Sequence, residues 1–91
     1  MMRSDLVCAD HVTSAVAVAL RQTRRRAGLT LEELSRRTGI QPPILSRIES
    51  GRSETSIRIA IGFARAVGID PRDVLLAVAD FVEAQERAEV A

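Results

Sequence analysis

Arginine is the residue type that offers the most chemistry in this sequence. All thirteen basic side chains of the 91-residue chain are arginines, and the planar guanidinium group binds phosphate and carboxylate through paired hydrogen bonds. Nine of them lie between Arg21 and Arg58 beside four glutamates, whereas the segment from Asp70 to Ala91 holds two arginines and six acidic residues. The middle of the chain is therefore suited to a phosphate-bearing partner, although such a charge run is often only a solvated face.

The same sequence contains few residues that could support catalysis or bind a metal ion. Cys8 is the only cysteine and His11 the only histidine, so the chain has no internal disulfide and no cluster with the spacing of a metal site. No Ser/His/Asp set and no glycine-rich phosphate loop can be assembled from the remaining residues. We therefore expect a protein that is not an enzyme and needs no cofactor, with Cys8 and His11 as ordinary residues near the start of a helix.

The length of the chain and its apolar pattern predict one small domain that does not enter a membrane. The 91 residues are enough for one modest core. No apolar run approaches the length of a membrane span, and the segment from Met1 to Leu20 carries Asp5 and Asp10 where a signal peptide needs a basic start and a long apolar stretch. We expect a soluble protein of the cytoplasm.

Start and stop signals divide the chain into five helical segments, which predicts an all-α fold. Thr30 followed by Glu33 is the pattern of a capping box, and Asp70 followed by Pro71 marks the start of the last helix. The expected helices run from about Asp10 to Ala27, from Thr30 to Gly39, from Pro43 to Ser50, from Ser56 to Gly68, and from Asp70 onward. The apolar residues expected to face inward on the fourth helix are Ile57, Ile61, Ala64 and Val67.

The second and third helices are joined by a very short connection. Gly39 ends one helix, and only Ile40, Gln41 and Pro42 precede the next, which is the spacing of a helix-turn-helix. Proline is tolerated where the missing N–H would lack a partner, but the residue before a proline resists helical angles. We therefore expect Pro43 at the first helical position and Pro42 as a non-helical cap.

The third helix is expected to have one buried and one exposed face. Leu45 and Ile48 are spaced i, i+3 and would face the core. The outer side would then carry Ile44, Ser46, Arg47 and Ser50.

The segment from Val16 to Leu76 resembles the Cro and phage-repressor family of helix-turn-helix proteins, also called the xenobiotic-response-element family. The resemblance is carried by the stretches "LRQTRRRAGLTLEELSRRTGI", "LSRIESGR" and "ARAVGIDPRDVL". It implies a compact, lambda-repressor-like bundle of five helices. It also implies a sequence-specific DNA-binding transcriptional regulator, such as a repressor, whose recognition helix enters the major groove. Finally, it implies a structural ion pair between Arg24 and Glu49.

The resemblance assigns DNA contacts position by position. Its base-reading positions fall on Pro42, Pro43, Ile44 and Arg47, and its backbone-contacting positions on Leu31, Ser50, Arg52 and the loop that leads to Arg58. We include Gln41 and Ser46, which lie among these positions, in the same expected DNA-binding set.

Several of these residues depart from the pattern of the family. Leu31 stands where a phosphate-contacting glutamine is common, and Glu54 places a negative charge in a loop that should face phosphates. Among the base-reading positions only Arg47 can make a bidentate contact to guanine, while Ile44 can press against a thymine methyl group. Free backbone N–H groups at the start of the third helix can hold a phosphate. Direct readout of the bases would then rest on few side chains.

The same departures support an alternative function. Pro42, Pro43 and Ile44 would form an exposed apolar knob, and such a knob suits contact with another protein. In this alternative the chain is an adaptor or an antitoxin-like helix-turn-helix module that docks on a protein partner.

The last helix carries more apolar residues than a small bundle needs to cover its core. We expect Val78, Phe81 and Val82 to meet a second copy of the chain across a two-fold axis, which would make the protein a homodimer. The expected organisation is a flexible N-terminal segment over residues 1–9, a helix-turn-helix DNA-binding domain over residues 10–76, and an extension of the C-terminal helix over residues 77–91 that mediates dimerisation.

Overall fold

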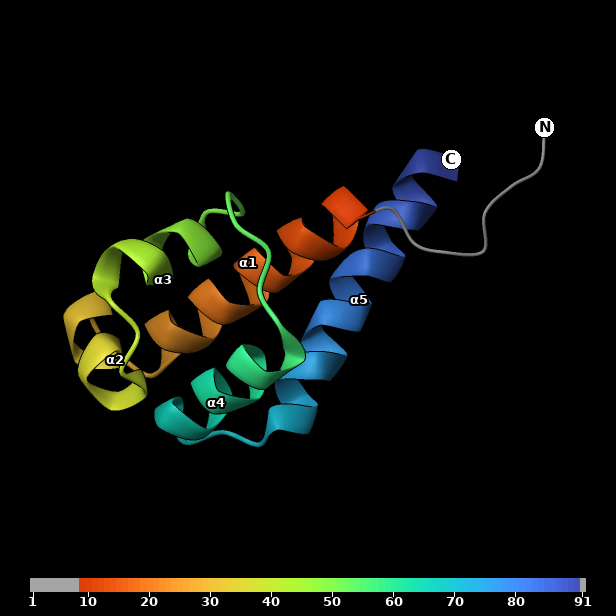
Figure 1. The fold of residues 1–91 in the computed structure, drawn as a ribbon. Coiled ribbons are helices and arrows are strands. Elements are labelled where there is room, and N and C mark those ends of the chain that lie inside the picture. Colours follow the sequence, from red (N-terminus) through yellow and green to blue (C-terminus); the bar gives the residue numbers. More distant parts are fainter. Residues whose placement is uncertain (1–8, 91) are drawn as a thin grey trace.

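The computed structural model describes residues 9–90, with the side chains of residues 11–88. Cys8 and almost all of the expected N-terminal segment lie outside the described residues. The helices are α1 (Ala9–Arg26), α2 (Leu31–Thr38), α3 (Pro42–Glu49), α4 (Ile57–Val67) and α5 (Pro71–Val90). The described part of the chain contains no strand, so the predicted all-α fold is confirmed (Figure 1).

The short helix α2 begins and ends at the residues that its sequence signals indicate. The backbone N–H of Glu33 donates to Oγ1 of Thr30 at 3.1 Å, and the N–H of Thr30 donates back to the Glu33 carboxylate at 3.3 Å, which completes the capping box. At the other end, Gly39 has a φ of 78° and its N–H donates to the carbonyl of Ser35. A left-handed residue at this place ends the helix and lets the chain turn directly toward α3.

The start of α3 differs from the prediction by one residue. Gln41, and not Pro42, is the N-cap in extended conformation, and Pro42 and Pro43 occupy the first two helical positions. Gln41 precedes a proline and lies outside the helix, as the restriction on such residues predicts. Pro42 also precedes a proline, but it adopts helical angles.

This shift leaves no free N–H group at the tip of α3. Prolines have no N–H, and the N–H groups of Ile44 and Leu45 donate to the carbonyl of Gln41 at 3.0 and 3.1 Å. Of the backbone N–H groups at this helix start, that of the N-cap residue Gln41 is left to hold a phosphate, so the expected phosphate contact stays a prediction that rests on this one group.

Helices α4 and α5 are also capped by their own side chains. Ser56 Oγ accepts from the N–H of Ile59 at 3.1 Å, and an Asp70 carboxylate oxygen accepts from the N–H of Arg72 at 2.9 Å. A hydrogen bond from the backbone N–H of Arg72 and, to a lesser extent, hydrogen bonds from its guanidinium lower the pKa of the Asp70 carboxyl group. Negative charge at a helix start is favoured by the helix dipole.

The inward face of α4 is not the one predicted at its start. Ile57 is 63% exposed, whereas Ala60, Phe63 and Ala64 are buried. The buried residues still follow helical spacing, whereas Ile57 stands at the first helical position of α4 and is largely exposed. The prediction that Ile57 faces inward is wrong.

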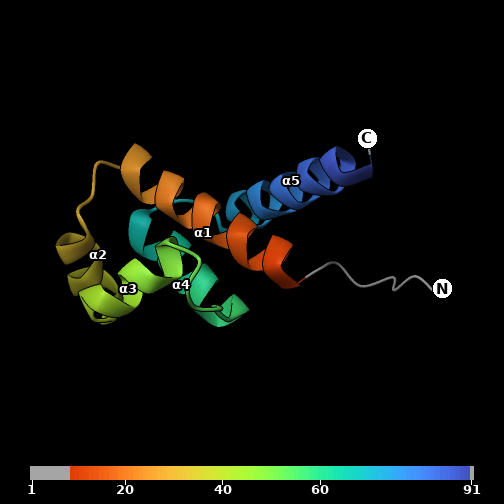
Figure 2. The ribbon, with the colours of Figure 1, turned by 90° about the horizontal axis from the view of Figure 1, so that it is seen from above.

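The core takes one large, fully buried side chain from each helix: Leu20, Leu34, Leu45, Phe63 and Val74. Ile48 packs against the same cluster, so both predicted core residues of α3 are buried. α1 contacts α3, α4 and α5, and its most extensive packing is with α5. Figures 1 and 2 show α2, α3 and α4 gathered at one end of the molecule, while α5 extends away from them.

A polar contact joins the start of α1 to the end of α5. Nδ1 of His11 lies 2.9 Å from Oε2 of Glu86, and the side chain of His11 is only 10% exposed. This contact holds the last turns of α5 beside α1. Within the part of the chain that the structure describes, no helix is long and apolar enough to cross a membrane.

Candidate nucleic-acid interface

An ion pair fixes α3 against the end of α1. Nε of Arg24 lies 2.8 Å from Oε2 and 3.1 Å from Oε1 of Glu49, and Nη2 donates to Oε1 at 2.8 Å. A further guanidinium N–H donates to the carbonyl of Leu29 at 2.8 Å. The side chain of Glu49 is only 5% exposed. The contact implied by the family resemblance is thus present as a buried, two-pronged pair, and its hydrogen bonds raise the pKa of Arg24 against the opposing effect of burial.

With Leu45, Ile48 and Glu49 turned inward, the opposite side of α3 is open to solvent. Pro42 is half-buried, and the other predicted contact residues of this segment are exposed: Gln41, Pro43, Ile44, Ser46, Arg47 and Ser50. The Gln41 side chain makes no capping hydrogen bond. The hydroxyl of Ser50 donates to the carbonyl of Arg47 at 3.1 Å, so its hydrogen is already in use.

The exposed face of α3 has two chemically different parts. At its tip lie Pro42, Pro43 and Ile44, and Ile44 is 50% exposed. One turn further, Arg47 extends into solvent, and its side chain makes no hydrogen bond or ion pair with any residue that the structure describes. The helix therefore presents an apolar tip followed by one free cation.

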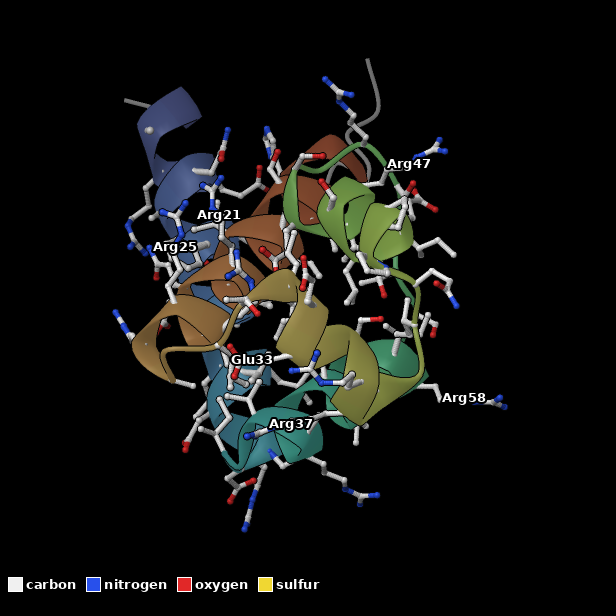
Figure 3. All side chains as sticks on the ribbon, turned by 90° about the vertical axis from the view of Figure 1, so that its left-hand side faces the viewer. Arg21, Arg25, Glu33, Arg37, Arg47 and Arg58 are labelled. Carbon is white, nitrogen blue, oxygen red and sulfur yellow. The ribbon has the colours of Figure 1, made fainter. Side chains whose placement is uncertain are left out.

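Two more exposed cations follow α3 in the sequence. Arg52, in the loop after α3, and Arg58, at the start of α4, are both exposed. In Figure 3, Arg47 and Arg58 project toward the same side of the molecule, whereas Arg21 and Arg25 lie on the opposite side of the view. In this view cations lie on both sides of α2 and α3, with Arg47 and Arg58 on one side.

A shallow hollow separates the outer face of α3 from the start of α2. It has a volume of about 190 Å³ and is lined by Arg21, Arg24, Leu31, Ser46, Glu49 and Ser50. The first N–H groups of a helix lack partners inside it, so the start of α2 can present such donors to this hollow. Leu31 and Ser50, which the resemblance names as backbone-contacting positions, therefore share one hollow.

The basic middle of the chain is not all available to a partner. Arg24 is committed to Glu49, and Nη1 of Arg37 donates to the carbonyl of Ala66 at 3.0 Å. Arg37 thereby serves the end of α4, where unpaired carbonyls favour a cation. Charge counting along the sequence missed this role, because residues 37 and 66 meet only in the folded chain.

The residues expected to mediate dimerisation are partly covered by their own chain. Val82 is 8% exposed and lies in the core, while Val78 and Phe81 are half-buried. Larger apolar surface on α5 is found at Leu75 and Leu76, which are 38% and 62% exposed. Residues 77–90 continue the same helix, because α5 runs without a break from Pro71 to Val90.

Among the described residues, no group of three His, Cys, Asp or Glu side chains could hold a metal ion. Exposed polar, cationic and apolar side chains come together on the open face of α3 and in the segments that flank it.

Comparisons with known proteins agree with this geometry. A sequence profile described as helix-turn-helix matches residues 20–74. A search of curated proteins finds no match. Two crystal structures of the clp gene regulator ClgR from Corynebacterium glutamicum are similar to this chain. One is 35% identical with a TM-score of 0.71, covering 76% of this chain and 90% of that one. The other is 33% identical with a TM-score of 0.77, covering 86% and 83%.

A third solved structure shares the fold. It is a hypothetical transcription factor, NHTF, from Neisseria, which is 23% identical with a TM-score of 0.67 and covers 100% of this chain and 98% of that one. The profile match spans α2, α3 and α4 together with the end of α1 and the start of α5. The chain therefore belongs to the helix-turn-helix family, of the xenobiotic-response-element type.

Proposed function

We propose that this protein is a sequence-specific DNA-binding transcriptional regulator of the Cro and phage-repressor type, acting in the cytoplasm. The observation that carries the proposal is the open outer face of α3. The buried Arg24–Glu49 pair holds this helix in place, and the face carries the side chain of Arg47, which has no partner among the described residues. A short exposed helix fixed across a tight turn suits the major groove of DNA. The similarity to ClgR, a regulator of the clp gene, supports the same function.

In this proposal the side chains divide into base readers and backbone contacts. Arg47 reads a guanine through its paired N–H groups, because arginine to guanine is the commonest specific contact in the major groove. Arg52 and Arg58 neutralise phosphates beside the helix, and the start of α2 contributes backbone N–H groups near Leu31. The exposed amide of Gln41 and the hydroxyls of Ser46 and Ser50 lie within the same surface.

The salt dependence of binding tests the proposal. We expect the logarithm of the affinity for duplex DNA to fall with the logarithm of salt concentration at a slope of about −0.9 per phosphate contact, so roughly −3 to −6 for a dimer. Fluorescence anisotropy with a labelled duplex at several salt concentrations gives this slope. Arg58→Ala should make it shallower by about 2 in a dimer, because each subunit loses one contact. Arg65→Ala, which removes an exposed cation near the other end of α4, is the matched control. Absence of binding at low salt would contradict the proposed function.

A specific observation favours a second candidate function, docking on another protein. The tip of α3 exposes Ile44, and none of the three residues of the tip, Pro42, Pro43 and Ile44, has a free backbone N–H group. An exposed apolar patch can mark a protein contact. An adaptor or antitoxin-like module would use Pro42, Pro43 and Ile44 in this way. Its binding would respond weakly to salt, so the same titration separates the two functions.

We also propose that the protein binds DNA as a homodimer that pairs through α5. Leu75 and Leu76 are exposed on α5, and Leu75 lies three residues, less than one helical turn, from the half-buried Val78. A second copy of the chain would cover this apolar surface. A two-fold dimer would present two recognition helices about 34 Å apart, one turn of DNA. Val82 would support this face from the core rather than meet the partner.

Leu76→Glu should weaken this dimer. A two-fold interface contains each residue twice, so one substitution removes two leucines whose burial contributes about 1.5–3 kcal/mol each, and the dissociation constant should rise at least about tenfold. Sedimentation equilibrium at tens of micromolar should show twice the chain mass for the unchanged protein and a lower mass for Leu76→Glu. Gln22→Glu introduces the same charge on an exposed position of α1 and should leave the mass unchanged. A monomer mass for the unchanged protein would contradict the dimer.

A further inference from the structure

The tip of α3 combines three features that restrict what it can recognise. Its side chains, those of Pro42, Pro43 and Ile44, carry no hydrogen-bonding group. Its backbone offers no free donor, because the two prolines lack N–H groups and the N–H of Ile44 is bonded to the carbonyl of Gln41 at 3.0 Å. Ile44 is nevertheless 50% exposed on the same outer side as Arg47.

Only one chemical group in the major groove matches such a surface. Base edges present hydrogen-bond donors and acceptors, and the exception is the methyl group on C5 of thymine. A phosphate or a guanine edge facing the tip would lose its hydrogen bonds to water and gain none from the protein. The apolar tip is therefore suited to a C5-methyl group.

We propose that Ile44 reads the C5-methyl group of a pyrimidine, so that the recognised site carries a thymine close to the G·C pair read by Arg47. This inference rests on the proposed DNA-binding function and names what one part of that surface recognises. Because 5-methylcytosine carries the same methyl group at the same position, the protein then also responds to cytosine methylation at that base.

The spacing along α3 says how far apart the two bases lie. Ile44 and Arg47 are three residues apart, so their Cβ atoms are about 5–6 Å apart on the helix surface. Successive base pairs are stacked at roughly 3.4 Å. The thymine therefore lies one or two base pairs from the G·C pair.

Base analogues test this contact on the full-length chain. A binding site is first selected from a random duplex library, and each thymine is then replaced singly by deoxyuridine, which lacks only the methyl group. One replacement, near the essential G·C pair, should weaken binding about fourfold, as expected for about one buried methyl-sized group. Cytosine at that position should bind more weakly than thymine, and 5-methylcytosine should recover part of the loss.

Variants assign the methyl contact to Ile44. Ile44→Ala should bind the thymine and deoxyuridine duplexes equally, whereas Ile57→Ala, which shortens an exposed isoleucine on α4, should keep the fourfold ratio. Circular dichroism checks that both variants are folded. Binding to the selected duplex with no sensitivity to any thymine methyl would overturn this inference while the proposed function stands. Failure to bind any duplex would overturn the proposed function itself and favour a protein at the apolar tip.

Discussion

Arg24→Ala should lower the free energy of unfolding by about 3–5 kcal/mol, because it leaves a buried carboxylate without its partner. Glu49 is only 5% exposed and receives three hydrogen bonds from the guanidinium of Arg24. The substitution also removes the donor to the carbonyl of Leu29. Urea unfolding followed by circular dichroism measures the change, which is a large part of the stability of a small domain.

Two further variants separate loss of charge from loss of the pair. Arg25→Ala removes a neighbouring exposed arginine and should change stability by no more than about 0.5 kcal/mol. The double variant Arg24→Met/Glu49→Leu replaces both charges by apolar side chains of similar size and should be close to neutral, since no unpaired charge remains. If Arg24→Ala costs no more than Arg25→Ala, the pair does not hold α3 as inferred.

Local signals in the sequence account for most of the helix boundaries. Thr30 with Glu33 and Asp70 with Pro71 act within one turn of the chain, and the structure contains both caps as predicted. Gly39 has the left-handed conformation that glycine adopts most easily. These features depend on neighbours in sequence, so reading the sequence is sufficient to find them.

The start of α3 and the exposed end of α4 needed more than local rules. Two proline rules compete at Pro42, because proline suits the first helical turn and the residue before a proline resists it. The structure resolves the conflict by placing Gln41 outside the helix. Ile57 satisfies helical spacing, but spacing alone does not say where the core ends.

Long-range contacts were the least predictable part of the candidate site. Arg37 reaches the carbonyl of Ala66, and His11 pairs with Glu86 although the two are 75 residues apart. Neither contact leaves a pattern in the sequence. The Arg37 contact also engages one of the arginines that the charge count along the sequence treated as available to phosphates.

Arg47→Ala should weaken binding to the selected DNA site by about 1–3 kcal/mol and relax the preference at one base pair, while binding to random DNA falls far less. The reason is that Arg47 is the long cationic side chain on the exposed face of α3, and it makes no contact with any described residue that would hold it elsewhere. Competition binding with the selected duplex, single-base variants of it, and random duplexes measures all three effects.

Ile44→Ala gives the comparison that decides how α3 is used. In the major groove the loss of one methyl contact is milder than the loss of Arg47, about 0.8 kcal/mol per buried CH₂ group. On a protein partner the order reverses, because an apolar residue centred in a desolvated patch can contribute about 2 kcal/mol or more while a cation at the rim contributes little. Both variants should keep their circular dichroism spectra, since Leu45 and Ile48 carry the buried face. Equal losses for Arg47→Ala on selected and random DNA would show that Arg47 contacts a phosphate, and its assignment as the base reader would then be wrong.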